Sequence, residues 1–314
     1  MTVERLRMRP DGTFKIVQFT DLHWNNGEEA DMRTRALMER VVAAERPDLI
    51  VFTGDVIESR RCRDPERSFK DAVSVAADSG VPWAALFGNH DSEGNVTREQ
   101  LMRAQLSLPG AVAEFGPPEL EGVGNFALPV WDSAGVRLAA ALYCFDSGSY
   151  SDLAEAPGYG WIGERQLAWF RREAAALRTA GGGVPVPSLA FMHIPLPEYR
   201  EVWNSRYCYG RRHEKVNCAP INSGLFAAMM ESGAVRGVFC GHDHINDYVG
   251  ELYGIRLCYG RATGYATYGR WLYSRGARVI RLRQGKPFDT WLRLATGRVI
   301  TQPRKHRPTC FSRA

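Results

Sequence analysis

The stretch DLIVFTGDV, residues 48–56, decides the fold class, because it joins a short apolar run to a Gly-Asp turn. A continuous apolar run of this length, bounded by turn residues, is typical of a strand that is buried on both faces. Five similar runs lie before and after it along the chain, and we expect all six to be strands. They are FKIVQF (14–19), WAALF (83–87), LAAALYCF (138–145), SLAFMH (188–193) and VRGVFC (235–240).

Helical patterns separate the first four of these strands. Residues 31–45 carry apolar side chains at helical spacing, and residues 68–79 and 97–106 look helical too, the last with Thr97 as its cap. Strand, helix and strand in repeated order predict βαβ units and a mainly parallel sheet. The fold class is therefore α/β.

The pattern changes after Gly122. Residues 124–145 read as two strands joined by a turn at 133–135, which predicts a hairpin and a second, antiparallel sheet. Residues 164–178 form an amphipathic helical pattern that ends in a glycine-rich breaker. Residues 195–221 are polar, aromatic and unpatterned, so we expect a long loop or insertion, which its length makes a candidate for function. Strand patterns return in DYVGELYGIRLCYG (247–260) and RVIRLRQ (278–284).

The composition is that of one globular domain. The chain has 314 residues, of which 45% are hydrophobic and 24% charged. We expect a single domain over residues 1–300 and a basic, flexible tail over 301–314, where the net charge of +5 is most concentrated. Neither a secretory signal nor a run of roughly 20 apolar residues is seen, which predicts a cytoplasmic protein without a membrane span.

Cysteine usage fits a reducing compartment. The seven cysteines are an odd number and show no metal-type CxxC spacing, so we expect reduced thiols. Cys208 and Cys218 are close enough in sequence to leave their pairing open.

Polar residues of the metal-ligand type follow five of the expected strands. In open α/β sheets, the edge at the carboxyl ends of the strands is where ligands bind. Five of the seven histidines lie at these positions, which scattered core histidines would not do. The residues are Asp21, His23, Asp55, Asn89, His90, Asp91, His193, His242, Asp243 and His244.

The types and number of these residues predict two metal ions. Carboxylate, amide and imidazole ligands without cysteine suit manganese, iron or zinc. Seven of these ten residues are candidate ligands, which is more than one ion would take while keeping an open position. One carboxylate can bridge two ions roughly 3.5–4 Å apart. Glycines before Asp55, Asn89 and His242 permit the tight bends that such a site needs. Taken singly, D-x-H and Gly-Asp are ordinary turns, GNHD is rarer, and GHDH is the most specific motif. The series in order carries the prediction.

The ordered series D-x-H (21–23), GD (54–55), GNHD (88–91), His193 and GHDH (241–244) resembles the signature of calcineurin-like metallophosphoesterases. HIPLPEY (193–199) and GYATYGR (264–270) further resemble the purple-acid-phosphatase-related branch that includes the yeast Dcr2 phosphatase. The resemblance implies a four-layer α/β/β/α sandwich. It also implies hydrolysis of phosphate esters with a water activated by two metal ions, in the first place as a phosphomonoesterase.

The resemblance assigns a role to each residue of the series. His90 would lie just outside the metal ligands and stabilise developing charge or protonate the leaving oxygen, with Asp91 as a partner that orients it. Asp55 would bridge the two ions. One ion would be held by Asp21, His23, Asp55 and His244, and the other by Asp55, Asn89, His193 and His242.

The chain departs from the true purple enzymes at two positions. Those enzymes carry a metal-bound tyrosine where this chain has Glu58, and a D-x-G motif where it has Asp21-Leu22-His23. We therefore expect no purple colour, and neither an acid pH optimum nor an obligatory ferric ion is implied. Arginines in the 195–221 segment could grip a second phosphate, although solvated surface charge is the simpler interpretation. They are Arg206, Arg211 and Arg212.

Two other functions stay open at this point. One is a phosphodiesterase or nuclease of the same superfamily, and the other is a metal-binding regulatory module without catalysis. The modest basicity disfavours dedicated nucleic-acid binding, so the expected partner is a phosphate ester on a small molecule or a phosphoprotein. Two aromatic clusters remain. We expect one in the core, with Trp161, Trp169 and Phe170. The other could border the cleft or pack beneath it, with Tyr259, Tyr265 and Tyr268.

Overall fold

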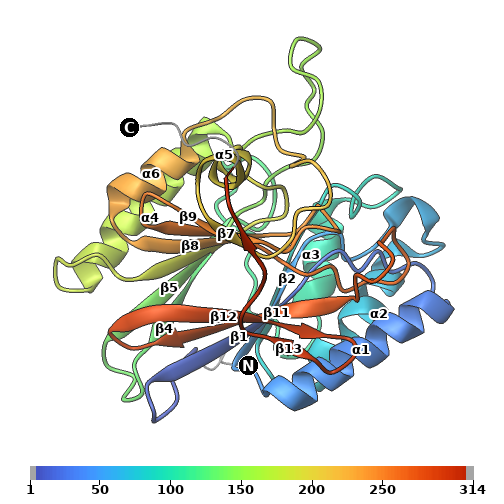
Figure 1. Ribbon diagram of the computed structural model, residues 1–314, viewed down its shortest axis with the longest axis horizontal. Coiled ribbons are helices and arrows are strands. Elements are labelled where there is room, and N and C mark those ends of the chain that lie inside the picture. The colour runs from blue at the N-terminus through green and yellow to red at the C-terminus, as the bar shows by residue number, and fades with distance from the viewer. Residues whose placement is uncertain (1–4, 309–314) are drawn as a thin grey trace.

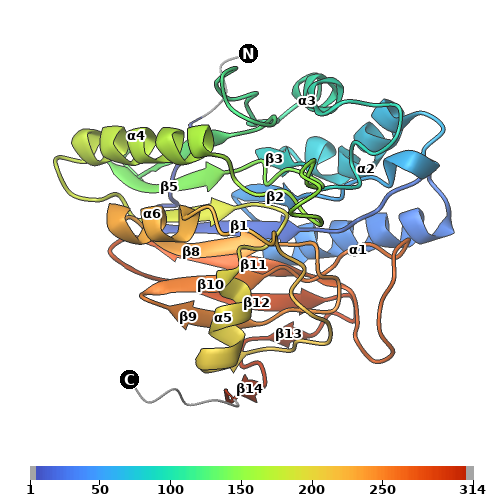
Figure 2. The ribbon, with the colours of Figure 1, turned by 90° about the horizontal axis from the view of Figure 1, so that it is seen from above.

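The computed structural model describes residues 5–308, which form two stacked β-sheets with helices on both outer faces (Figures 1 and 2). The first sheet has six strands. In sheet order they are β13 (Val299–Ile300), β12 (Lys286–Leu294), β11 (Gly276–Arg283), β1 (Thr13–Phe19), β2 (Leu49–Thr53) and β3 (Trp83–Leu86).

Strands β1, β2 and β3 are parallel, as the βαβ pattern predicts, with Val17 opposite Ile50 and Phe52 opposite Ala85. The outer face of this sheet is covered by α1 (Glu29–Glu45), α2 (Pro65–Asp78) and α3 (Arg98–Leu106), and a 3-10 turn lies at Ser59–Arg61 (Figure 2). Helix α3 begins at the predicted cap, because the Thr97 hydroxyl accepts the Gln100 amide hydrogen and the Gln100 side chain accepts that of Thr97.

The second sheet has eight strands, of which the fourth to seventh in sheet order are parallel. Its outer face carries α4 (Glu164–Ala180), α5 (Glu198–Ser205) and α6 (Leu225–Ser232) (Figure 1). In sheet order the strands are β14 (Lys305–His306), β7 (Cys208–Tyr209), β9 (Val249–Leu252), β10 (Ile255–Tyr259), β8 (Val235–Cys240), β6 (Ser188–Phe191), β5 (Leu138–Cys144) and β4 (Phe126–Trp131).

Two hydrophobic clusters hold these layers together. One joins the first three helices, the first sheet and the space between the sheets, and the other lies between the second sheet and its helices. In the second cluster the rings of Tyr143 and Phe170 pack edge to face, with centroids 5.0 Å apart. The α/β/β/α sandwich is confirmed. Trp169 and Phe170 are buried in the core as expected, whereas Trp161 is half-buried.

Two predicted loop segments contain regular structure. Residues 195–221, expected to be a long loop or insertion, include α5 and β7, so this segment is not a loop throughout. Lys305 and His306, in the expected solvated tail, form β14 against β7, and the His306 ring stacks on Trp203 at 3.7 Å. The physical reason is that β7 leaves an edge to pair and Trp203 an apolar ring to cover, which the basic composition did not reveal. Residues 309–314 of that tail lie outside the described residues.

Six of the cysteines lie within residues 5–308, and all six are free thiols, including Cys208 and Cys218. Within the same residues, no helix combines the length and apolar character that crossing a membrane requires.

Candidate metal centre

The carboxyl ends of the central strands of both sheets meet in one place. The sequence pattern suggested a single sheet edge, but the ligand-type residues come from two stacked sheets whose parallel strands run the same way. Three strands of the first sheet and two of the second supply them. Asp21 and His23 follow β1, Asp55 follows β2, Asn89 follows β3, His193 follows β6, and His242 and His244 follow β8.

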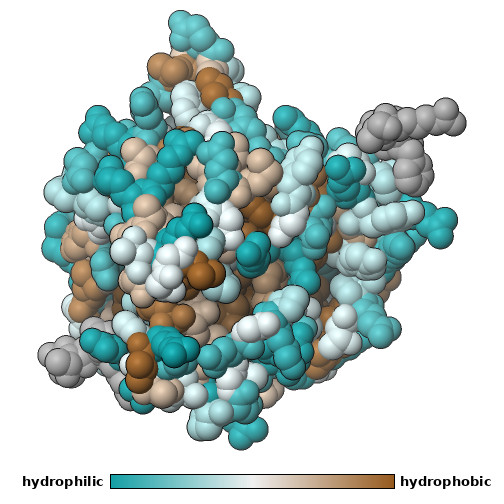
Figure 3. Space-filling view, turned by 90° about the vertical axis from the view of Figure 1, so that its left-hand side faces the viewer, coloured by the Kyte–Doolittle hydropathy of each residue, from teal (hydrophilic) through white to brown (hydrophobic). Residues whose placement is uncertain are grey.

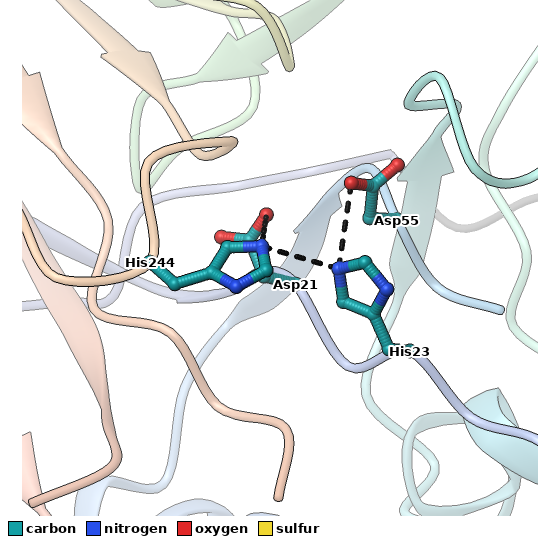
Figure 4. Close-up of side chains that lie close together, drawn as sticks. All are labelled: Asp21, His23, Asp55 and His244. Atoms are coloured by element: carbon teal, nitrogen blue, oxygen red, sulfur yellow. Dashed lines mark hydrogen bonds and ion pairs between the residues drawn. The ribbon is translucent and has the colours of Figure 1, made fainter. Parts of the chain in front are cut away.

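The first group of ligand atoms contains Asp21, His23, Asp55 and His244, all buried (Figure 4). His23 Nε2 lies 3.2 Å from His244 Nε2 and 3.5 Å from Asp55 Oδ2. His244 Nε2 lies 3.6 Å from Asp21 Oδ1. One ligand atom from each of the four residues thus lies within 4.8 Å of all the others, an arrangement that fits one cation.

The second group shares Asp55 with the first. Asp55 Oδ2 lies 3.1 Å from His193 Nε2, which in turn lies 3.2 Å from His242 Nδ1. Asn89 Oδ1 is buried without a hydrogen-bond partner, while Asn89 Nδ2 donates to the Tyr150 hydroxyl at 3.2 Å. A buried carbonyl oxygen with no donor costs free energy unless something else binds it, and a cation would. The residues present therefore fit two metal ions with Asp55 between them.

The backbone at this centre is strained. Asp21, His23, Asp55 and His242 have φ of 54°, 48°, 49° and 75°, a region that residues other than glycine rarely adopt. Each such residue costs on the order of 1–3 kcal/mol and persists only where surrounding structure holds it. Gly88 precedes Asn89 at a point where a Cβ atom would collide with the Asp55 carboxylate, which explains the glycine. Strain is thus concentrated where the ligands gather.

Hydrogen bonds at the Nδ1 atoms orient three of the histidines. His193 Nδ1 donates to the Thr53 carbonyl at 2.8 Å, and His23 Nδ1 lies 3.0 Å from Glu58 Oε2. His244 Nδ1 lies 3.0 Å from the Thr267 hydroxyl. Each bond leaves Nε2 facing the ligand cluster, the arrangement in which an outer partner fixes the tautomer of a metal-binding histidine. Glu58, which stands where the purple enzymes have tyrosine, acts here through His23.

The charges at the centre suit cation binding. Burial would raise the pKa of Asp55, but His193 and His23 outweigh it and hold that pKa well below its usual value. Burial lowers the pKa of His242 to about 3. Asp55 is therefore ionised and His242 neutral near pH 7, as metal ligation requires. Burial lowers the pKa of His193, but Asp55 and Asp21 raise it to about 9, so a bound cation would have to displace a proton from His193.

His90 lies beside the cluster, but its partner is not the one the sequence suggested. Its backbone N–H donates to Asp55 Oδ1 at 2.9 Å, and its ring Nδ1 lies 2.9 Å from Glu93 Oε2. The Asp91 carboxylate instead accepts the backbone N–H groups of Ile57 and Gly88, at 2.9 and 2.7 Å. The role expected for Asp91 as partner of His90 was wrong, because its short side chain points back to these amides and fixes the turn.

Glu93 and Tyr150 are site residues that the sequence reasoning missed. The Tyr150 hydroxyl donates to Glu93 Oε1 at 2.7 Å and accepts from Asn89, so a continuous chain of hydrogen bonds joins Asn89 to His90. Burial lowers the pKa of His90, but Glu58, Asp55 and Glu93 together raise it to about 10. The position of Glu93 three residues after His90 is the only sequence signal, and it does not distinguish Glu93 from a solvated charge.

Aromatic rings border the centre. Tyr159 meets His242 edge to face at 4.4 Å and stacks on Tyr150 at 5.6 Å. Tyr268 stacks on His244 at 4.1 Å, and its hydroxyl donates to Glu214 Oε2 at 2.8 Å.

The other residues singled out from the sequence lie further from the ligands. Tyr259 lies beneath the site and donates to Asp243, whereas the half-buried Tyr265 packs under Arg33. The guanidinium of Arg206 lies over Tyr253, and that of Arg212 over Trp203. The Arg211 backbone N–H donates to Asp247.

Known proteins are similar to this chain in sequence and in fold. The calcineurin-like phosphoesterase family matches residues 14–246. A protein of Arabidopsis thaliana named probable inactive purple acid phosphatase 29 is 38% identical, with 92% of this chain and 84% of that protein covered. Phosphatase DCR2 of Saccharomyces cerevisiae is 33% identical over 82% of this chain and 49% of its own length.

Among solved structures, a dimetal phosphatase from Danio rerio superposes with a TM-score of 0.57 at 14% identity, covering 88% of this chain and 98% of the other. A purple acid phosphatase from yellow lupin seeds gives 0.56 at 12% identity, covering 93% of this chain and 53% of its own. These likenesses show the fold. With the family match over most of the chain and the geometry of the site, they lead to one conclusion: the chain belongs to the calcineurin-like phosphoesterase family.

Proposed function

We propose that this protein is an active phosphoesterase that uses two metal ions of manganese, iron or zinc and acts on phosphomonoesters. The observation that carries the proposal is the complete ligand set, in which Asn89 Oδ1 is buried without any partner among residues 5–308. An unsatisfied buried oxygen beside two clusters of ligand atoms is what a site built for cations presents.

Each ion would be held by its own set of residues, with Asp55 common to both sets. Asp21, His23 and His244 would hold one ion, Asn89, His193 and His242 the other, and Asp55 both. When bound, two such ions activate a water molecule and polarise the phosphoryl oxygens of the substrate. The hydrogen bonds from Glu58 and Thr53 keep His23 and His193 oriented for this task.

His90 is the group placed to handle a proton. Glu93 accepts from its Nδ1 atom, which leaves Nε2 free to donate to the oxygen that leaves with the alcohol. Three carboxylates, those of Glu58, Asp55 and Glu93, favour its protonated form. A donor that is charged near neutral pH would also offset the negative charge that develops on the phosphoryl group.

The carboxylates that border the metal centre favour a phosphomonoester over nucleic acid as the substrate. Glu93 and Glu214 are held beside the centre through Tyr150 and Tyr268, so a polyanionic strand would meet carboxylates there. The family resemblance and the relatives named as phosphatases support the same choice. We propose a phosphate ester on a small molecule or a phosphoprotein as substrate. Its location in the cytoplasm stays a prediction.

The second candidate function is metal binding without catalysis. It is favoured by the names of three relatives from Arabidopsis thaliana, which include the word inactive. The two functions differ in what His90 contributes, because a binding module needs no proton donor.

The test compares p-nitrophenyl phosphate with bis-p-nitrophenyl phosphate as substrates of metal-stripped protein restored with manganese, iron or zinc. We expect turnover that favours the monoester, and a fall of about 10²–10⁴-fold in kcat for His90→Ala with metal content unchanged. Faster cleavage of the diester would replace the monoesterase by the phosphodiesterase alternative. Two bound ions without hydrolysis of either substrate would favour the binding module.

A further inference from the structure

A cavity lies at the opposite end of the strands from the metal centre. It has a volume of about 430 Å³ and opens where β5, β6 and the β9–β10 and β11–β12 turns come together. The amino ends of β6 and β8, whose carboxyl ends carry His193, His242 and His244, lie at this cavity, at the left of Figure 1. Figure 3 looks onto this face and shows hydrophobic residues gathered in a hollow, with hydrophilic residues around them.

The floor of the cavity is apolar. Met8, Ala140 and Leu189 line it from one side, and Leu282 and Phe288 from the other. Ala140 and Leu189 come from the second sheet and Leu282 and Phe288 from the first, whereas Met8 precedes β1, so the cavity is the open end of the sandwich. All five side chains are buried, so the cavity is a recess lined by core residues and not an exposed apolar patch.

The rim of the cavity is basic. Arg236 and Lys286 line it, and within residues 5–308 neither has a carboxylate oxygen within 4.0 Å. Arg283, which pairs with Asp289 at 3.0 Å, keeps its Nε buried without a hydrogen-bond partner. Arg256 lies with its guanidinium carbon 4.7 Å from the centre of the Phe288 ring.

Against these cations the lining has one acidic residue, Glu251, which lies 3.7 Å from Arg256. The rim therefore holds positive charge that no carboxylate of the described chain offsets, together with one unsatisfied buried donor.

We propose that this cavity binds a small amphipathic anion, namely an aliphatic or aromatic group carrying one carboxylate, sulfonate or phosphate. The apolar part would cover the floor, and the anionic group would reach Arg236, Lys286 and the free Nε of Arg283. The volume lies in the range of about 300–1,000 Å³ that is usual for small-molecule sites. This site is separate from the metal centre and does not depend on the function proposed for it.

The test is a fluorescence titration with 8-anilinonaphthalene-1-sulfonate, an aromatic anion, and with the uncharged N-phenyl-1-naphthylamine. We expect saturable binding of one anion per chain, weakened at least tenfold in the double variant Arg236→Ala/Lys286→Ala. The uncharged probe should bind the wild type and this variant equally. The matched control Lys70→Ala/Arg103→Ala removes the same charge from α2 and α3 and should leave binding unchanged.

Two further arms locate the site and define the ligand. Ala139→Trp places a large ring in the cavity lining and should abolish binding. Dodecanoate and dodecyl phosphate should displace the probe, whereas dodecanol and inorganic phosphate should not. The proposal would be overturned if the cavity and control double variants lost binding equally. It would also be overturned if Arg236→Ala/Lys286→Ala bound the anion as tightly as the wild type. Because both double variants change exposed or half-buried residues, near-UV circular dichroism should show them folded.

Discussion

At the scale of single residues, the centre depends on side chains that hold the ligands as much as on the ligands themselves. Glu58 shows this, since its two oxygens face two histidines, at 3.0 Å from His23 Nδ1 and 3.5 Å from His90 Nδ1. Burial would raise its pKa, but the hydrogen bonds to His23 and His90 lower it to about 2. Glu58 is therefore ionised at any pH at which the protein would work.

Replacing Glu58 should weaken metal binding without removing a ligand. We expect Glu58→Ala to lower metal affinity about 10–100-fold, the usual cost of losing the outer partner of a metal-binding histidine. Glu58→Gln, which keeps an acceptor for His23 Nδ1, should lose less. Competition with a fluorescent chelator measures both affinities, and equal affinity in the wild type and Glu58→Ala would contradict the role given to Glu58.

His90 should make the stability of the metal-free protein depend on pH. Its pKa in the folded chain, about 10, lies above the ordinary value of 6.5. Its stabilising contribution is therefore full below about pH 6.5 and is lost as the pH rises toward 10. Urea unfolding of the metal-free wild type and His90→Asn should give a difference in unfolding free energy that shrinks across this range. A difference in unfolding free energy that grows with pH would show that the folded chain does not raise the pKa of His90.

At the scale of elements, helix α3 fixes the loop that carries Asn89. Arg98, in its first turn, is buried and donates through Nη2 to the carbonyls of Gly88 and Gly148, at 2.8 and 2.9 Å. Its Nη1 pairs with the buried Asp146. A helix at the surface of the sandwich is thereby tied to the turn after β3 and to the loop that bears Tyr150.

Removing the Arg98 cation should destabilise the fold, because Asp146 would be left as an uncompensated buried charge. We expect Arg98→Met to lower the free energy of unfolding by about 3–5 kcal/mol, measured with urea. The double variant Arg98→Met/Asp146→Asn should recover part of that loss. A cost for the single variant within the roughly 0.5 kcal/mol of an ordinary surface substitution would show that the pair does not hold the loop.

Elements with strong local signals could be predicted from the sequence, and those fixed by distant contacts could not. The apolar run at 48–53 and the Thr97 cap carry their own information, so β2 and the start of α3 were predicted correctly. Helix α6 was missed because LFAAMMES is apolar over most of its surface and shows no clear amphipathic period. Strand β14 depends on pairing with β7, about a hundred residues away in sequence, which no local pattern reports.

The candidate site divides in the same way. The ordered motifs at strand ends identified the residues that form the two ligand clusters, because parallel strands bring their carboxyl ends together. The residues that contact the ligands from outside, Glu58, Glu93 and Tyr150, could not be predicted. Their contacts depend on where their side chains point, which the sequence does not show. Asp91 was assigned the wrong role for this reason, as adjacency to His90 says nothing about where its carboxylate points.

At the scale of the whole molecule, the centre joins the two sheets. His193 comes from the second sheet and Asp55 from the first, yet His193 Nε2 and Asp55 Oδ2 are 3.1 Å apart. Cations bound there would connect both halves of the sandwich, and any ligand that binds only the folded chain stabilises it.

Metal should therefore raise the melting temperature. With metal at 100 times its dissociation constant, the gain is about 2.7 kcal/mol for one site, which corresponds to a rise of about 4 °C for a chain of this length. His193→Ala should reduce the rise measured by differential scanning calorimetry, while Lys70→Ala, on the distant helix α2, should not. A melting temperature that changes neither when metal is added nor when a chelator removes it would contradict a centre that joins the sheets.

The most direct test of the central claim is the metal content of the purified, reconstituted protein, measured by elemental analysis together with turnover of p-nitrophenyl phosphate. Wild type should hold two ions per chain and turn over, and Asp55→Ala, which removes the shared carboxylate, should hold at most one and show no turnover. A wild-type chain that binds no metal, or an Asp55→Ala variant that keeps two ions and full activity, would contradict the account.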